Sequence, residues 1–269
     1  MSPGETSSAP GDLYYEQRGR PDGPAVVFLH GLGSSAADWR WQVPAFDGRY
    51  RVITLDLPAH GRTALSGRPI RERLSVEAMA GAVSQLLARL GESPAHVVGL
   101  SLGGCVALAL AVGAPARVRS LTLVNTFARL RPAGWRGAYR ILERFVLLAV
   151  APMPIIAARV AQSLFPGPEQ VELRAAAVAS LARNDKRAYL AAMRAVARFD
   201  VRRELAAIRC PTLIVAGDED TTVPRASAEL LRRRIPNARL LVVPGSGHAT
   251  PYDQPDLFNR LVLEFVSGH

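Results

Sequence analysis

The chain has 269 residues, of which 49% are hydrophobic, so it is long enough for one large domain or for one domain that carries an insertion. Its formal net charge of +10 comes from 33 basic and 23 acidic residues. Lys186 is the only lysine, and the arginines are scattered along the chain. Because no compact basic block is interleaved with aromatic residues, we expect no nucleic-acid partner.

Cysteine spacing and apolar runs exclude further classes of protein. Cys105 and Cys210 stand in no metal-binding or C-x-x-C spacing, so we expect no metal site, no cofactor and a reducing compartment. The most apolar stretch, 145–165, is interrupted by two prolines and Arg159, which argues against a membrane span. Residues 1–17 lack the basic start and apolar core of a signal peptide. We therefore expect a cytoplasmic protein with a disordered tail over 1–11 and no membrane partner.

Short apolar and β-branched runs alternate with longer helical patterns after this tail. Most of the short runs show little alternation, as is typical of parallel strands buried on both faces. In chain order we expect strands over 25–30 and 51–57, a helix over 76–90, a strand over 96–100, a helix over 102–112, strands over 120–125 and 211–217, a helix over 226–234, a strand over 238–244 and a helix over 256–266. The alternation predicts an α/β fold with a mostly parallel sheet flanked by helices.

One region, from about 129 to 208, breaks this alternation. It contains helical patterns separated by proline and glycine, and no strand-like run. About 80 residues are too many for a simple crossover between two strands. We therefore expect a helical cap, or lid, over 129–205, inserted into a core formed by 12–128 and 206–269.

The run HVVGLSLGGCVALAL places a serine between a strand and a helix. Gly99, Ser101 and Gly103 fit the pattern G-x-S-x-G in that strand–turn–helix setting. A tight turn of this kind strains the backbone and presents the serine hydroxyl, while the glycines avoid steric clashes. The alternative is a small-residue turn that only packs the helix on the strand. The setting favours Ser101 as a nucleophile.

A serine hydroxyl needs a base to take its proton, and His248 is the best candidate. His30 and His60 each precede a glycine at a turn, which suits a structural side chain. His96 begins the strand that leads to Ser101, and therefore lies at the wrong end of it. His248 follows the last strand in a Gly/Ser-rich loop, which can carry its imidazole across the top of the sheet.

A carboxylate is then needed to orient the imidazole. The segment GDEDTTVP, after the strand over 211–217, offers Asp218, Glu219 and Asp220, of which Asp220 lies deepest in the loop. The loop after the strand over 120–125 offers Asn125 and Thr126, so no carboxylate stands at that alternative position.

Two backbone donors are required to hold an oxyanion. The N–H of Leu102, directly after the serine, supplies one, and HGLGSS supplies the other from Leu32. HGLGSS matches neither G-x-G-x-x-G nor a P-loop, which argues against a nucleotide site.

Together these segments resemble the α/β-hydrolase superfamily over nearly the full chain. The matching pieces are HGLGSSAADW, VITLDLPAHGRT, VVGLSLGG, LIVAGDEDTTVP and GSGHATPYDQPDLFNRLVLEFV. The resemblance implies Ser101 as nucleophile, Asp220 as acid, His248 as base, and Leu32 and Leu102 as oxyanion donors. Within the superfamily the chain is similar to enol-lactonases, carboxylesterases, meta-cleavage C–C hydrolases and cofactor-free haloperoxidases. Two departures are mild: Ala59 replaces a usual glycine, and Gln254 a common glutamate.

We therefore expect a serine hydrolase that cleaves an ester, lactone or thioester of a small, largely apolar substrate. The same three residues would also serve a C–C bond hydrolase, or a cofactor-free lyase or isomerase in a catabolic or biosynthetic pathway. A ligand-binding protein without catalysis is the remaining alternative. The arginines of the cap leave open a substrate carboxylate, and the sequence leaves open a monomer or a homodimer.

Overall fold

The computed structural model of the protein describes residues 13–63, 74–91, 94–130 and 134–269. The tail predicted over 1–11 lies outside the described residues. A seven-stranded sheet forms the centre, in the order β1-β3-β2-β4-β5-β6-β7. Its strands are β1 (Tyr15–Gly19), β2 (Ala25–Leu29), β3 (Arg51–Leu55), β4 (Ala95–Leu100), β5 (Val118–Val124), β6 (Thr212–Gly217) and β7 (Ala238–Val243). All neighbours pair in parallel except β1, which runs antiparallel to β3.

The predicted α/β fold with a mostly parallel sheet is confirmed, and the sequence prediction missed one strand. β1 reads YEQRG, and only its first residue is buried. An edge strand needs few apolar residues, so its sequence carries little strand signal. In contrast, every residue of β2, β4 and β6 is buried, as the continuous apolar runs indicated.

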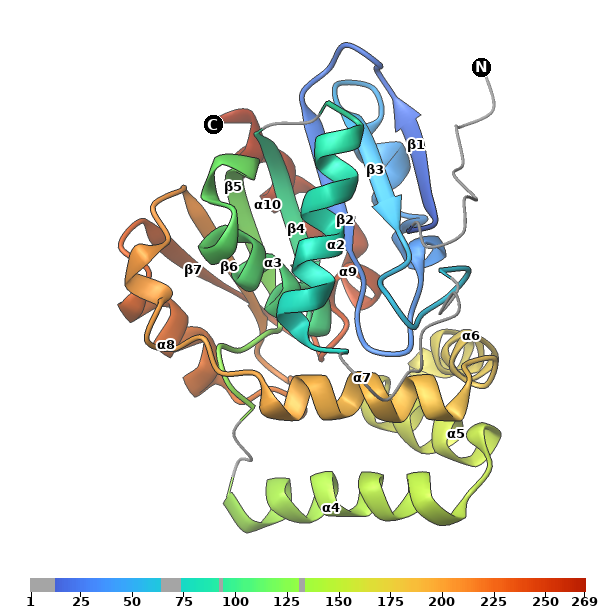
Figure 1. Cartoon of the computed structure of the whole chain (residues 1–269). Helices are drawn as coiled ribbons and strands as arrows, with labels where there is room; N and C mark the ends of the chain where they lie inside the picture. Colours follow the sequence, from blue (N-terminus) through green and yellow to red (C-terminus); the bar gives the residue numbers. More distant parts are fainter. Residues whose placement is uncertain (1–12, 64–73, 92–93, 131–133) are drawn as a thin grey trace.

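Helices cover both faces of the sheet (Figure 1). On one face lie α2 (Val76–Arg89), α3 (Leu102–Gly113) and α8 (Arg225–Arg234), which share an apolar core with the strands. On the other lie α1 (Val43–Phe46) and α10 (Pro255–Ser267). Short helices complete these layers: η1 (Ala36–Trp39), η2 (Pro115–Arg117), η4 (Leu205–Ala207) and α9 (Thr250–Asp253).

The predicted helical insertion is present between β5 and β6. It contains α4 (Gly134–Val150), α5 (Met153–Leu164), η3 (Pro168–Gln170), α6 (Val171–Leu181) and α7 (Lys186–Arg198). These helices lie at the carboxyl ends of the parallel strands (Figure 1). A β-bridge joins Arg129 to Asp200, so the two ends of the insertion meet. The domain boundaries at 129 and 205 remain predictions.

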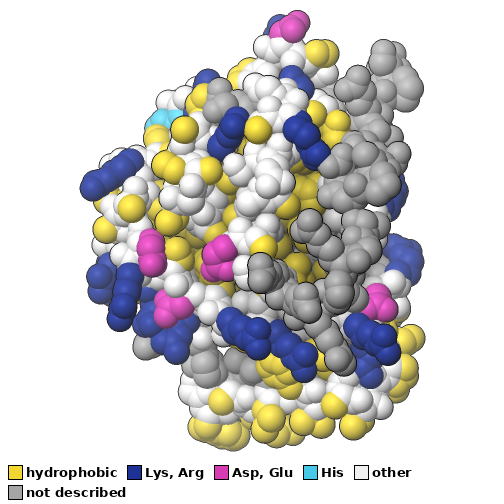
Figure 2. Space-filling view, in the orientation of Figure 1, with side chains coloured by type: hydrophobic (Ala, Val, Ile, Leu, Met, Phe, Trp, Pro, Cys, Tyr) yellow, Lys and Arg dark blue, Asp and Glu magenta, His cyan; other side chains and the backbone are white. Residues whose placement is uncertain are grey.

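The visible surface carries no single basic block. Figure 2 shows Lys and Arg side chains spread over this face, with hydrophobic side chains gathered along the edge where Figure 1 places α4. That edge includes Trp135, Tyr139, Leu142, Val146 and Val150, each more than half exposed. Among the described residues, no helix has the length and apolar character needed to cross a membrane.

Candidate active site

Ser101 stands at a strained turn between β4 and α3. Its φ of +53° and ψ of −111° lie where non-glycine residues are uncommon. A Cβ on Gly99 would lie 2.3 Å from the Gly103 carbonyl oxygen, and a Cβ on Gly103 would lie 2.0 Å from that of Leu29. Only glycine fits at either position, so the backbone contacts of the turn require both glycines of G-x-S-x-G.

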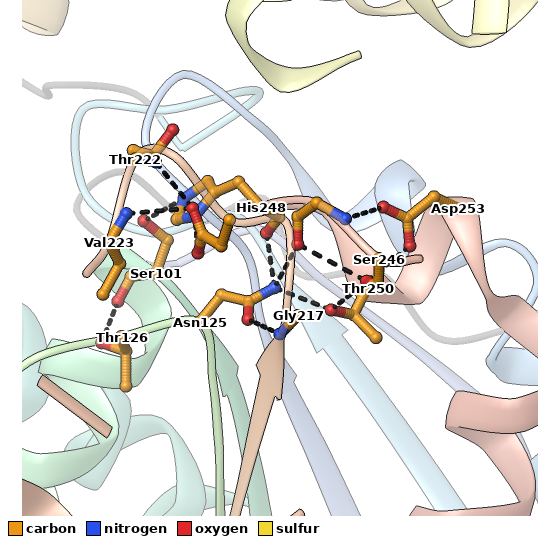
Figure 3. A network of polar contacts seen from close by, with 12 residues as sticks. Ser101, Asn125, Thr126, Gly217, Thr222, Val223, Ser246, His248, Thr250 and Asp253 are labelled. Carbon is orange, nitrogen blue, oxygen red and sulfur yellow. Dashed lines mark hydrogen bonds and ion pairs between the residues drawn. The ribbon is translucent and has the colours of Figure 1, made fainter. Parts of the chain in front are cut away.

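Two hydrogen bonds hold the strained Ser101 backbone in place. Its N–H donates to the Val124 carbonyl over 2.9 Å, and its carbonyl accepts from Thr126 Oγ1 over 2.7 Å (Figure 3). The Thr126 side chain needs the space beside Gly104, where a Cβ would come within 2.6 Å of it. The loop after β5 therefore fixes the turn after β4.

His248 lies between Ser101 and Asp220. Its Nε2 is 3.0 Å from Ser101 Oγ, and its Nδ1 is 2.8 Å from Asp220 Oδ2. The side chains of His248 and Asp220 are only 8% and 4% exposed. The structure thus brings together the serine, histidine and acid that were predicted, from loops at the carboxyl ends of β4, β7 and β6.

Backbone groups orient Asp220 toward the histidine. Its Oδ1 accepts from the N–H groups of Thr222 and Val223 at 2.7 and 2.9 Å, which leaves Oδ2 for His248. Asp218 and Glu219, the other acids of the loop, are exposed. Of the three candidate acids, Asp220 is the one whose carboxylate contacts His248.

Asn125, at the end of β5, joins the loops that carry the acid and the base (Figure 3). Its Oδ1 accepts from Gly217 N at 2.9 Å, and its Nδ2 donates at 2.8 Å to both His248 O and Thr250 Oγ1. From the sequence, this position is notable only for lacking a carboxylate. Its partners stand about 90 to 125 residues away, so no local pattern could have revealed the role.

A half-buried carboxylate, that of Asp253, holds the loop that carries His248. Asp253 accepts from Ser246 Oγ at 2.8 Å and from Gly247 N at 2.7 Å. Burial raises the pKa of Asp253, and the charge of Asp220 raises it further, although both hydrogen bonds and His248 lower it. The residues on either side of His248 are thus held by polar contacts.

The loop that contains Leu32 runs beside Ser101, since a Cβ on Gly31 would lie 3.8 Å from Ser101 Cβ. His30 Nε2 accepts from Leu57 N at 2.9 Å, so His30 Nδ1 carries the proton that reaches the Gly31 carbonyl at 2.8 Å. In a planar trans peptide the Leu32 N–H points opposite to that carbonyl. His30 therefore fixes the direction of the Leu32 N–H.

The other expected donor, Leu102, is the first residue of α3. N–H groups in the first turn of a helix have no partner within that helix, and they lie at the positive end of its dipole. Both Leu32 and Leu102 line the same cavity as Ser101 and His248. The insertion supports the Leu32 loop, because Asn184 Nδ2 donates to the Gly33 carbonyl over 2.7 Å.

The remaining described histidines are buried, apart from the terminal His269. Burial lowers the pKa of His30 to about 4, that of His60 to about 3 and that of His96 to about 4. His60 bonds to the Pro58 carbonyl, and His96 to Ser120 Oγ. Their neutral rings serve packing and local backbone contacts. Among the described residues, no group of three or more His, Cys, Asp or Glu side chains could hold a metal.

A cavity of about 330 Å³ opens at Ser101, between the sheet and the insertion. Apolar side chains of the insertion form much of its wall, including Phe145, Phe165 and Met193. Trp135, an aromatic residue of the insertion on α4, is 75% exposed. This volume lies at the small end of the range for ligand sites.

The fold and this arrangement of Ser101, His248 and Asp220 define an α/β protein of the hydrolase type. A sequence profile described as the alpha/beta hydrolase fold matches residues 24–255. The chain therefore belongs to the alpha/beta hydrolase fold family, and it is a hydrolase of that fold, as the resemblance implied.

Individual relatives cover nearly the whole chain. A protein of Azorhizobium caulinodans named "Putative carbamate hydrolase RutD" is 36% identical over 261 residues, 94% of each chain. The enol-lactonase of Burkholderia xenovorans has a TM-score of 0.85 and 26% identity, over 95% of this chain and 96% of that one. A meta-cleavage product hydrolase of Pseudomonas fluorescens has a TM-score of 0.81 and 25% identity, over 99% and 98%.

Proposed function

We propose that the protein is a serine hydrolase that cleaves a carboxylic ester, lactone or thioester of a small, largely apolar substrate through an acyl-serine intermediate. The supporting observation is the position of His248, within hydrogen-bonding distance of both Ser101 Oγ and Asp220 Oδ2. A nucleophile, a base and an orienting carboxylate in this order are what acyl transfer by serine requires. The cavity of about 330 Å³ suits a small molecule.

In the first half of the reaction, Ser101 Oγ attacks the carbonyl carbon while His248 Nε2 takes its proton. Asp220 accepts from Nδ1–H and stabilises the imidazolium. The carbonyl oxygen becomes an oxyanion, to which the N–H groups of Leu32 and Leu102 donate. The bond to the leaving group then breaks, and His248 gives that group its proton.

In the second half, water replaces the leaving group. His248 Nε2 takes a proton from the water, whose oxygen attacks the acyl carbon. The second tetrahedral intermediate uses the same two N–H donors. When it collapses, the bond from the acyl carbon to Ser101 Oγ breaks, Ser101 recovers a proton from His248, and the acid leaves.

A carbamate is a further scissile group for the same residues. The carbonyl of a carbamate accepts attack by Ser101 Oγ in the same geometry, and the relative at 36% identity is named as a carbamate hydrolase. Carbamates therefore belong beside esters, lactones and thioesters in any panel of substrates.

Labelling with a fluorophosphonate tests the nucleophile. We expect one label per chain on Ser101, and none on the Ser101→Ala variant. The rate with p-nitrophenyl acetate should fall by roughly 10³-fold or more in Ser101→Ala and in His248→Ala, because the three residues act as a unit. Failure of the folded wild-type protein to take the label would contradict the proposal.

A C–C bond hydrolase is the second candidate, which the similarity to the meta-cleavage product hydrolase favours. There the same residues would release a carbon leaving group. A yellow dienol substrate that bleaches on addition of the protein, combined with slow turnover of every ester, lactone and carbamate in the panel, would select this reaction.

A further inference from the structure

An acidic side chain lies in the wall of the substrate cavity, apart from Ser101, His248 and Asp220. Asp38, in η1 after β2, is the one Asp or Glu among the described residues that line the cavity. It is partly buried in a wall that is largely apolar but that also contains Arg40 and Arg183. A carboxylate in such surroundings is costly unless it is paired or fully hydrogen-bonded. Its presence therefore requires a reason.

The contacts of Asp38 join two loops of the site. The side chains of Ser34, in the loop that follows Leu32, and of Tyr252, in α9 after His248, lie near enough to the Asp38 carboxyl group to lower its pKa, and so does the backbone N–H of Ser35. All three residues line the cavity. An ionised carboxylate offers about four acceptor positions, so these three donors leave at least one of them open toward a ligand.

No ion pair neutralises Asp38 in the part of the chain that the structure describes. Arg40, whose charge lowers the pKa of Asp38, holds its guanidinium carbon 3.9 Å from the centre of the Trp41 ring. Burial raises the pKa of Asp38, although Ser34, Tyr252 and Arg40 all lower it. The negative charge of Asp38 is thus only partly neutralised by the protein, as expected of a group that accepts a hydrogen bond from a ligand.

We propose that Asp38, together with Ser34 and Tyr252, forms a polar subsite that binds an N–H group of the substrate, so that acyl compounds carrying a carbamoyl or similar N–H donor are preferred. This subsite rests on the proposed function only in taking the substrate to be an acyl compound. The carboxylate accepts the substrate N–H, and the hydroxyl groups of Ser34 and Tyr252 keep the carboxylate in place. The apolar walls of the insertion then take up the chain between this group and the scissile carbonyl.

Three p-nitrophenyl esters test the subsite, because they differ only at the end of the acyl chain. The 5-amino-5-oxopentanoate ends in a carboxamide, the 5-oxohexanoate replaces its NH₂ by CH₃, and the 5-(trimethylammonio)pentanoate carries a positive charge without N–H. We expect kcat/KM for the amide to exceed that for the ketone by about tenfold or more in the wild-type protein, the effect of one hydrogen bond to a charged group. The ratio should fall to about one in Asp38→Leu.

Two further variants keep this result interpretable. Asp22→Leu removes an exposed acid from the turn between β1 and β2, at the opposite end of the sheet, and should keep the wild-type ratio. Asp38→Asn preserves the size of the side chain and one acceptor oxygen, so an intermediate ratio is expected. A ratio near one in the wild type, an unchanged ratio in Asp38→Leu, or an equal gain with the trimethylammonium ester would overturn the assignment.

A binding measurement separates this proposal from the proposed hydrolysis. Calorimetric titration of Ser101→Ala with hexanamide and with heptan-2-one compares NH₂ with CH₃ in the absence of turnover. Tighter binding of hexanamide, lost in the Ser101→Ala/Asp38→Leu double variant, supports the subsite even if no ester is hydrolysed. Equal binding of the two ligands to Ser101→Ala rejects it even if Ser101 is the nucleophile.

Discussion

At the scale of single residues, some positive φ angles serve the site and others are only strained. Of the described residues other than glycine, Ala59, Ser101 and Asn125 have positive φ. Ser101 presents its hydroxyl to His248, and Asn125 bonds to the loops of the acid and the base, so both have polar roles that their conformation serves. Ala59, at φ +70°, makes no comparable contact. Its strain is therefore one that a substitution can relieve.

We predict that Ala59→Gly stabilises the protein by up to about 1 kcal/mol. A left-handed conformation costs an L-residue about 1–2 kcal/mol, which the greater freedom of glycine in the unfolded chain partly offsets. Urea unfolding of the two proteins measures the difference. Ala80→Gly, inside α2, is the matched control and should destabilise by about 1 kcal/mol, because that position is helical. Equal destabilisation by both substitutions would contradict the prediction.

At the scale of elements, the carboxyl ends of the strands carry the site. Ser101 follows β4, Asn125 follows β5, Asp220 follows β6 and His248 follows β7. Because parallel strands end at the same edge, residues far apart in the chain meet there. The Asn125 side chain bonds to both the acid loop, at Gly217, and the base loop, at His248.

We predict that Asn125→Ala lowers kcat more than it changes KM, because it frees the loops that position His248 without altering the cavity wall. Loss of its hydrogen bonds leaves buried backbone groups unsatisfied, which costs about 1–3 kcal/mol each in stability. Thr122→Val, on the same strand, is the control, because Thr122 Oγ1 is buried without a partner. Its kinetics should match the wild type. An unchanged kcat in Asn125→Ala would show that the loops hold His248 without it.

The elements also show what a single sequence can predict. The turn at Ser101 follows from local spacing, because Gly99 and Gly103 are required by backbone contacts of that turn. β1 was missed because an edge strand of mostly polar residues has no local signature. Asn125 and Asp38 were missed because their importance depends on residues of other loops, such as Thr250 and Tyr252. Local chemistry is readable from the sequence, while contacts between distant loops require the fold.

At the scale of the whole molecule, buried neutral histidines couple folding to pH. The pKa of His30 lies at about 4, that of His60 at about 3 and that of His96 at about 4, against about 6.5 in an unfolded chain. Below pH 6.5 the unfolded chain binds protons at these residues that the folded protein does not. Their contribution to stability is therefore full above pH 6.5 and is lost as the pH falls toward 4.

His96 allows this effect to be measured apart from the site, because it lies at the start of β4, at the opposite end from Ser101. Burial is the largest cause that lowers the pKa of His96, and the charges of Arg119 and His269 lower it further. In the wild type, His96 Nδ1 contacts Ser120 Oγ. The substitution His96→Asn puts the side-chain amide of asparagine near that position, so a polar group remains there. Carboxylates with raised pKa, such as those of Asp56 and Asp253, are common to both proteins and cancel in the comparison.

We predict that the unfolding free energy of His96→Asn falls less steeply with decreasing pH than that of the wild type. Between pH 6 and 4.5 the difference in slope should reach up to about 1.4 kcal/mol per pH unit, the value for one proton. Guanidinium chloride unfolding at several pH values measures both slopes, and above pH 7.5 the two slopes should agree. Parallel curves over the acid range would mean that His96 is protonated equally in the folded and unfolded chains, and that its burial does not keep it neutral.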